Sequence, residues 1–155
     1  MRLADVYLMY AESAMMGANS ATGKADNYGK TAVEAINVVR DRAGVGHVDS
    51  KFLGSAASLL PELRRERAVE LSFEGHRFND LRRWLLLTES PYTLKKAVSF
   101  DRAGTFNNQD PSQNRVVNIQ ENIILERKFT SKHYWLPLKV RDVNMYPEFY
   151  QNPGW

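Results

Sequence analysis

The 155-residue sequence contains no cysteine. Disulfide bonds, a thiol nucleophile and cysteine-ligated metals are therefore excluded, although the redox compartment stays open. The three histidines, His47, His76 and His133, do not have the spacing of metal ligands, so a zinc site would need carboxylates brought in by folding. We expect no metal and no cofactor.

Long apolar runs and runs of one charge are also missing. No segment approaches the roughly 20 apolar residues of a membrane span, and the chain opens on an expected helix without a secretion signal. We therefore expect this chain alone to be soluble. The formal net charge is only +3, and the arginines are interleaved with acidic residues, so nucleic acid is not an expected partner.

Recognisable catalytic motifs are absent as well. The sequence holds no G-x-S-x-G nucleophile elbow. Glycoside hydrolysis needs two carboxyl groups that face each other across a sugar, whereas Glu66, Glu70 and Glu74 are stacked along one expected helix beside arginines. We expect the chain not to be an enzyme.

The most informative stretch that is present is a charged, helix-forming segment over residues 58–87. Ser58 is its expected cap and Pro61 lies in its expected first turn. Apolar side chains fall on two opposite sides at 100° per residue, so this central helix is expected to pack on both sides. One side holds Leu60, Leu63, Leu71, Phe78, Leu81 and Leu85, and the other holds Val69, Phe73 and Trp84.

Charged residues lie within this apolar pattern, namely Arg67, Glu70, Glu74 and Arg77. A lone buried charge is costly, so these side chains should pair with one another at their i,i+3 and i,i+4 spacings, or with groups elsewhere in the chain. The pattern predicts a structural ion-pair network.

Residues 1–45 predict an antiparallel helical hairpin. Apolar residues recur at helical spacing until about Gly17, and a second helix begins near Thr31, which forms a capping box with Glu34, and ends at Gly44. The spacing of small residues and tyrosines resembles a tetratricopeptide-like pair, but no internal repeat is visible.

Residues 88–155 lack helical periodicity. We expect a long irregular loop from Thr88 to about Asn118, and then an irregular tail that wraps over the helices, with a short strand or a helical turn at residues 139–145. The predicted fold is mainly α: a tetratricopeptide-like helical hairpin plus a long central helix, with a long irregular loop and a wrapping C-terminal tail. Length favours a single domain over residues 1–155.

Several segments, in order, resemble the SusD/RagB family of nutrient-binding outer-membrane lipoproteins. They are residues 2–12 (RLADVYLMYAE), 35–45 (AINVVRDRAGV), 63–84 (LRRERAVELSFEGHRFNDLRRW), 136–138 (LPL) and 151–155 (QNPGW). Collinear agreement over nearly the whole chain is more specific than any single motif. The resemblance implies the C-terminal region of a longer protein, with a secretion signal, a lipid-bearing cysteine and an N-terminal helical region elsewhere.

The resemblance also implies a function. It indicates a non-catalytic subunit at the outer membrane and cell surface of a Bacteroidetes-type cell, which binds a glycan or peptide nutrient and delivers it to a TonB-dependent, SusC-like transporter. The membrane would be reached only through a lipid anchor that this chain lacks. The alternative is a tetratricopeptide-like protein–protein adaptor, which has no need of an aromatic loop; the full reading frame and its neighbouring gene would separate the two.

Aromatic residues outside the periodic segments are the candidate ligand contacts. The apolar face of a pyranose stacks on an aromatic ring while its hydroxyls pair with amides. The predicted ligand-binding residues are Tyr92, Phe100, Phe106, Asn107 and Asn108, and further candidates are Trp84, Trp135 and Trp155. In the alternative interpretation these aromatics anchor the loop to the core. No binding residue of the family transfers to a matched position.

Overall fold

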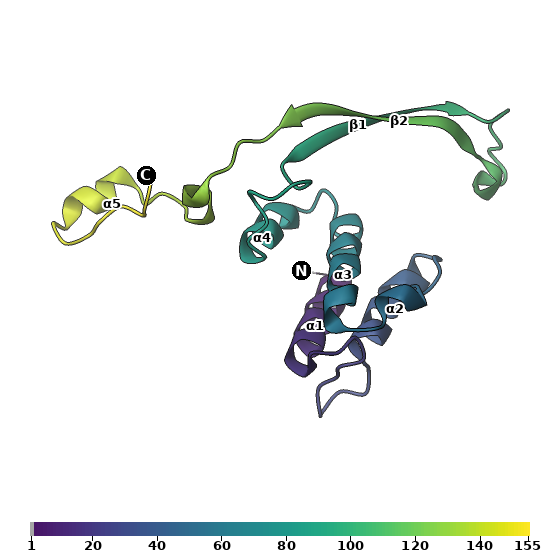
Figure 1. The fold of residues 1–155 in the computed structure, drawn as a ribbon, viewed down its shortest axis with the longest axis horizontal. Helices are drawn as coiled ribbons and strands as arrows, with labels where there is room; N and C mark the ends of the chain where they lie inside the picture. The colour runs from purple at the N-terminus through teal and green to yellow at the C-terminus, as the bar shows by residue number, and fades with distance from the viewer. Residues whose placement is uncertain (1) are drawn as a thin grey trace. The chain divides into compact units, whose positions relative to one another are not determined.

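A computed structural model describes residues 2–155 of the chain (Figure 1). The chain divides into two compact units, and the boundary in the sequence falls between Arg77 and Phe78. Within the described residues, the chain forms five α-helices and one two-stranded sheet. This mainly helical content agrees with the predicted class. The single domain expected over residues 1–155 stays a prediction.

The first unit is a cluster of three helices, α1 (Leu3–Ala18), α2 (Ala32–Arg42) and α3 (Ala56–Glu70). Helix α1 contacts both α2 and α3 (Figure 1). The three helices meet because each presents an apolar stripe at helical spacing. The largest fully buried side chains of this unit are Leu8, Met15, Ile36, Val39, Leu59 and Leu63.

The predicted capping box at the start of α2 is confirmed. The Glu34 amide donates to the Thr31 hydroxyl, and the Thr31 amide donates to the Glu34 carboxylate over 2.7 Å. These hydrogen bonds from Thr31 hold the pKa of Glu34 below its ordinary value. Gly44 follows α2 with a φ of +69°, as expected for a glycine that ends a helix.

The connector between α1 and α2 is fixed by a tyrosine and a glycine. The Tyr10 hydroxyl donates to the Lys30 carbonyl over 2.6 Å and accepts from the Ala25 amide over 3.1 Å. A Cβ atom at Gly23 would clash with the Ala14 carbonyl oxygen. Gly23 is therefore the residue that lets the connector approach the backbone of α1.

The expected single helix over residues 58–87 is two helices. Helix α3 ends at Glu70 and α4 (His76–Arg83) follows a tight turn, in which Phe73 and Gly75 have φ values of 63° and 80°. A right-handed helix cannot continue through such residues, and a glycine adopts this conformation at little cost. The cap also differs, because Ser55 caps α3 and Ser58 returns the hydrogen bond from the third helical position.

This break changes which apolar residues are buried. Leu63, Leu71 and Leu81 are buried as expected, whereas Phe78 and Leu85 from the same predicted face are exposed. Val69 and Phe73, predicted to pack on the second side, are exposed as well. The expectation of burial on two sides therefore does not describe this chain.

The predicted charged residues of this segment have partners on other helices. Glu70 accepts from Arg2 at 2.9 Å and from Arg42 at 2.7 Å, and Glu74 lies 2.6 Å from Arg2. Hydrogen bonding from Arg2 lowers the pKa of the Glu74 carboxyl. The sequence left open whether these charges pair with one another along the helix or with groups elsewhere in the chain. Glu70 and Glu74 both pair with groups elsewhere.

Arg67 lies deepest among these charges. Its Nη1 is 3.1 Å from Oδ1 of Asp5 on α1, and the two side chains are only 4% and 6% exposed. Arg77 lies on α4 and is exposed. The Arg67–Asp5 pair joins α1 to α3 inside the first unit.

A second ionic cluster connects α2 to α3. Arg40 Nη1 lies 3.2 Å from Glu62 and 2.8 Å from Glu66, and Arg65 donates twice to Glu62. Hydrogen bonding from Arg65, together with the charges of Arg65 and Arg40, holds the pKa of Glu62 below its ordinary value of 4.5. The ionised carboxylate of Glu62 is thus the form that the fold favours.

We expect Glu62 to make stability depend on pH. Because its pKa is lower in the folded chain, its contribution is complete above the unfolded value of 4.5 and is lost as the pH falls through the folded pKa. Glu62→Gln should therefore lower the melting temperature at pH 7, and the gap from the unmodified protein should narrow below pH 4.5. Calorimetric melting curves over this range would measure it, with exposed Glu148→Gln as the control. A gap that stays constant with pH would contradict the assignment.

The second unit contains an antiparallel β-hairpin where an irregular loop was expected. Strand β1 (Leu94–Arg102) pairs with β2 (Val116–Glu126), from Leu94 opposite Glu126 to Arg102 opposite Val116. The register of the pairing shifts at two places, between Lys95 and Lys96 and between Ser99 and Asp101. At the second place, which is nearer the tip of the hairpin, Asn118 has a φ of 54° and its side chain donates to the Asp101 carboxylate. Apolar residues recur two positions apart in β2, at Val117 and Ile119 and again at Ile123 and Leu125, which is the spacing of a strand.

The C-terminal tail is held together by polar side chains. Of the alternatives predicted for residues 139–145, the helical turn is confirmed as α5 (Val140–Met145). The Gln151 amide bonds both the N–H and the carbonyl of Leu138, at 2.7 and 3.0 Å. The Trp155 indole N–H donates to the carbonyls of Lys132 and Trp135. The closing segment is thus fastened to residues 132–138.

Candidate functional site

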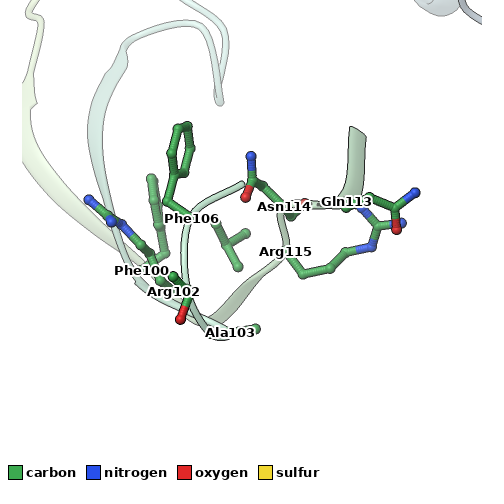
Figure 2. Close-up of a pocket in the computed structure, with 10 residues that line it drawn as sticks. Phe100, Arg102, Ala103, Phe106, Gln113, Asn114 and Arg115 are labelled. Atoms are coloured by element: carbon green, nitrogen blue, oxygen red, sulfur yellow. Dashed lines mark hydrogen bonds between the residues drawn. The ribbon is translucent and has the colours of Figure 1, made fainter. Parts of the chain in front are cut away.

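A pocket of about 150 Å³ lies at the tip of the β-hairpin (Figure 2). It is built from the end of β1, the start of β2 and the connection between them. The residues that matter for its chemistry are Phe100, Arg102, Phe106, Gln113, Asn114 and Arg115. Figure 2 shows the two phenylalanines and Arg102 on one side of the hollow, with Asn114 across from them and Arg115 and Gln113 farther out.

The strand geometry explains why Phe100 and Arg102 share the pocket. Residues two apart in a strand point to the same face, so both side chains project from one face of β1. Gly104 begins the turn with a φ of 130°, a conformation that a residue with a side chain rarely adopts. The chain then brings Phe106 back beside the end of β1.

The connection is held by its own polar side chains. Asn107 and Asn114 exchange two hydrogen bonds of 2.9 and 3.1 Å, and Asn107 Oδ1 also accepts from the Gln109 and Asp110 amides. The Asp110 carboxylate accepts from Ser112, which lowers the pKa of Asp110. These bonds fix the shape of the connection without any ligand.

The free surface of the pocket is aromatic and cationic. Phe100 and Phe106 are 56% and 50% exposed, so each ring offers a face to solvent. The Arg102 guanidinium carbon lies 5.4 Å from the centroid of the Phe106 ring, within the range of a cation–π contact. Arg115, by contrast, donates to the carbonyls of Ser112 and Asn114.

The structure places the predicted ligand residues in three positions. Phe100 and Phe106 line one pocket, whereas Asn107 supports the connection behind it and Asn108 is exposed beside it. Tyr92 precedes the other end of β1, about 26 Å from the tip at the usual rise of an extended strand. A ligand role for these five residues stays a prediction.

The sequence interpretation missed the polar residues of this pocket, namely Arg102, Gln113, Asn114 and Arg115. The alternation of apolar residues in β2 would have identified a strand. A pairing strand before it would have placed Arg102 on the face of Phe100. The position of Gln113 and Asn114 has no comparable signal, because it depends on the fold of the connection.

A larger hollow of about 400 Å³ in the second unit is lined by Trp135, Tyr134, Leu85 and Asn79, with Arg82 and Arg83. Its cations already have partners: Arg82 donates twice to the Tyr134 carbonyl, and Arg83 pairs with Asp80 at 2.9 Å and covers the Trp84 ring. The indole of Trp155 is likewise engaged in holding the tail. The rings of Trp84 and Trp155 therefore have structural contacts, whereas Trp135 is 57% exposed at this hollow, and the tip pocket differs from it in bringing two exposed rings together.

Across residues 2–155 no group of three or more acidic or histidine side chains is arranged to hold a metal ion. Within that same range, none of the helices combines the length and the apolar character needed to cross a membrane.

Comparison with known proteins places the chain in a family. Residues 1–155 match the SusD family, so the chain belongs to it. No curated protein matches the chain. Members of this family are generally nutrient-binding proteins of the outer membrane, and are binding proteins and not enzymes.

Solved structures show the same fold over the whole chain. A SusD-like protein (BF3747) from Bacteroides fragilis NCTC 9343 has a TM-score of 0.72 at 23% identity, covering 100% of this chain and 25% of that protein. BT4246 has a TM-score of 0.63 at 23% identity, and its selenomethionine form 0.65 at 24%; both are matched over 100% of this chain. The matched part is 23% of BT4246 and 24% of the selenomethionine form, so this chain spans about a quarter of these proteins.

Proposed function

We propose that this chain contributes a ligand contact to a nutrient-binding protein at the outer membrane of a Bacteroidetes-type cell. The ligand is a glycan or a peptide, which the whole protein binds without chemical change and passes to a SusC-like, TonB-dependent transporter. Family membership supports the general role. We locate the ligand contact at the tip pocket because two half-exposed rings, Phe100 and Phe106, line it.

Physical chemistry supports binding at this pocket. An aromatic face removes the apolar face of a sugar ring, or an apolar side chain of a peptide, from water. The connection is already fixed by its own hydrogen bonds, so little conformational entropy is lost when a ligand binds.

The carboxylates of α3 support a role without catalysis. Glu62 and Glu66 contact Arg40, and Glu70 contacts Arg2 and Arg42. A general acid must hold a proton near neutral pH, whereas hydrogen bonding from Arg65 keeps the pKa of Glu62 below its ordinary value. These glutamates join helices and do not face each other across a substrate.

Removing both rings tests this proposal. Phe100→Ala with Phe106→Ala should weaken the affinity for an oligosaccharide or peptide ligand by about 1–3 kcal/mol in total, and the fold should persist because both side chains lie at the surface. Titration calorimetry with a panel of oligosaccharides and peptides would measure the change.

A matched control uses two exposed apolar residues on the same hairpin outside the pocket, Ile123→Ala with Leu125→Ala. This pair should leave the affinity unchanged. Equal losses in both double variants would remove the site from the tip pocket. Hydrolysis of any panel member would contradict the non-catalytic role.

The alternative function, a tetratricopeptide-like adaptor, has one supporting feature. A hollow of about 380 Å³ on α1 and α2 is lined by Leu3, Tyr7 and Val38 and flanked by Arg2 and Arg42. An apolar groove between two helices can receive a helix from a protein partner. An adaptor would bind a protein partner, and small ligands would not compete with that partner. The neighbouring gene would then not encode a transporter.

A further inference from the structure

We propose that the tip pocket prefers oligosaccharides that carry a carboxylate, such as those with uronic acid units, and that Arg102 recognises this carboxylate. This inference rests on the proposed function, because it names the ligand class of the same pocket. It follows from the polar groups that remain available there, from the local charge and from the geometry of Arg102 beside the aromatic rings.

Most polar side chains around the pocket are already occupied. The Asn107 and Asn114 side chains hold the connection, and Arg115 donates to carbonyls of its own segment. The Asn114 amide, which lies across from the rings, is therefore engaged, and Gln113 lies farther out, where it bonds the Asp110 carboxylate. Within residues 2–155, no carboxylate lies within ion-pair distance of the Arg102 guanidinium, whose neighbour is the Phe106 ring.

The charge around the pocket is positive. Arg102 and Arg115 line it, and no aspartate or glutamate does. Asp101 is adjacent to Arg102 in β1 and so points to the opposite face, where it accepts from Asn118. The Asp110 carboxylate accepts from the amide and hydroxyl of Ser112. An anionic group that enters the pocket would meet two cations and no like charge.

The geometry fits a ring that bears a carboxylate. A guanidinium that covers an aromatic face keeps its N–H groups directed outward in its own plane, where a carboxylate binds with two parallel hydrogen bonds. A cavity of about 150 Å³ is large enough for one six-membered ring. A uronic acid unit could therefore stack on Phe100 or Phe106 while its carboxylate reaches Arg102. In an acidic peptide the side chain that bears the carboxylate has no flat apolar face of its own, whereas a uronic acid unit carries both on one ring, so the rings beside Arg102 favour the sugar.

Matched ligands test the inference. The probes are a trimer of galacturonic acid and the same trimer with its carboxyl groups reduced to alcohols, each titrated by calorimetry into the whole protein. We expect the acidic trimer to bind about tenfold more tightly, the scale of a charge-assisted hydrogen bond. Arg102→Gln should remove this preference while leaving the affinity for the reduced trimer unchanged. Arg102→Lys keeps the charge but not the planar fork, and should retain only part of the preference.

Two controls make the result specific. Lys128→Gln removes one positive charge at an exposed residue outside the pocket, and should change neither affinity by more than about twofold. Melting curves of each variant establish that it folds. If Arg102→Gln weakened both trimers equally, or if an acidic peptide bound more tightly than the acidic trimer, the inference would be overturned.

The remaining outcomes separate this inference from the proposed function. Equal binding of the two trimers, with loss in the Phe100→Ala and Phe106→Ala variant, would overturn the preference for a carboxylate and leave the pocket as a ligand site. Binding of any ligand that this double variant does not weaken would overturn the site, and the inference with it.

Discussion

Replacing Arg67 by alanine should lower the free energy of unfolding by about 3–5 kcal/mol. Arg67 and Asp5 are 3.1 Å apart and their side chains are 4% and 6% exposed, so the substitution leaves a buried carboxylate without this cation. An uncompensated charge in such a place either stays ionised at a high cost or takes up a proton. Urea denaturation followed by circular dichroism would measure the loss.

Two variants make the Arg67 result interpretable. Lys51→Ala removes an exposed cation 3.6 Å from Asp49 and should cost less than about 1 kcal/mol. Replacing both buried partners, with Asp5→Leu and Arg67→Met, should recover much of the loss because no charge is then stranded. Denaturation midpoints that coincide for Arg67→Ala and Lys51→Ala would show that the pair is solvated.

Leu63→Ala should cost about 2–5 kcal/mol, because it leaves a cavity in the core of the first unit. Leu63 is fully buried on α3 and belongs to the hydrophobic core that α1, α2 and α3 form together. Val69→Ala on the same helix serves as the control, since Val69 is exposed and its truncation removes little buried area. A control that destabilised the protein as much as Leu63→Ala would mean that Val69 is covered in the whole protein.

Local sequence signals predicted the helical hairpin well. The capping box of Thr31 and Glu34 and the glycine after α2 are determined by neighbouring residues, so they are visible in the sequence. The break before α4 was missed, because the apolar spacing continues through it while Phe73 and Gly75 adopt positive φ values. Periodicity reports the favoured face of a helix and not its continuity.

The partners of the charged residues could not be predicted. Asp5 and Arg67 are far apart in sequence, as are Arg2 and Glu70, and they meet only because α1 packs on α3. Helical spacing suggested neighbours on the same helix instead. The tertiary packing of α1 on α3 decided between the two alternatives.

The candidate site was predictable in part. Phe100 and Phe106 stand out as aromatics away from helical periodicity, and the structure brings them to one pocket. Arg102 was missed because residues 94–102 were interpreted as irregular loop, where the side chain of one residue says nothing about the direction of the next. Once these residues form a strand, the two-residue alternation places Arg102 beside Phe100.

Hydrogen–deuterium exchange of the whole protein, with and without a bound oligosaccharide, tests most directly whether the hairpin tip contacts ligand. Phe100 and residues 102–106 and 113–116 line the pocket, so ligand should slow the exchange of backbone amides in this segment. The Phe100→Ala and Phe106→Ala variant should lose this protection. Slower exchange confined to other regions, with residues 100–116 unchanged in the presence of a saturating ligand, would contradict the account.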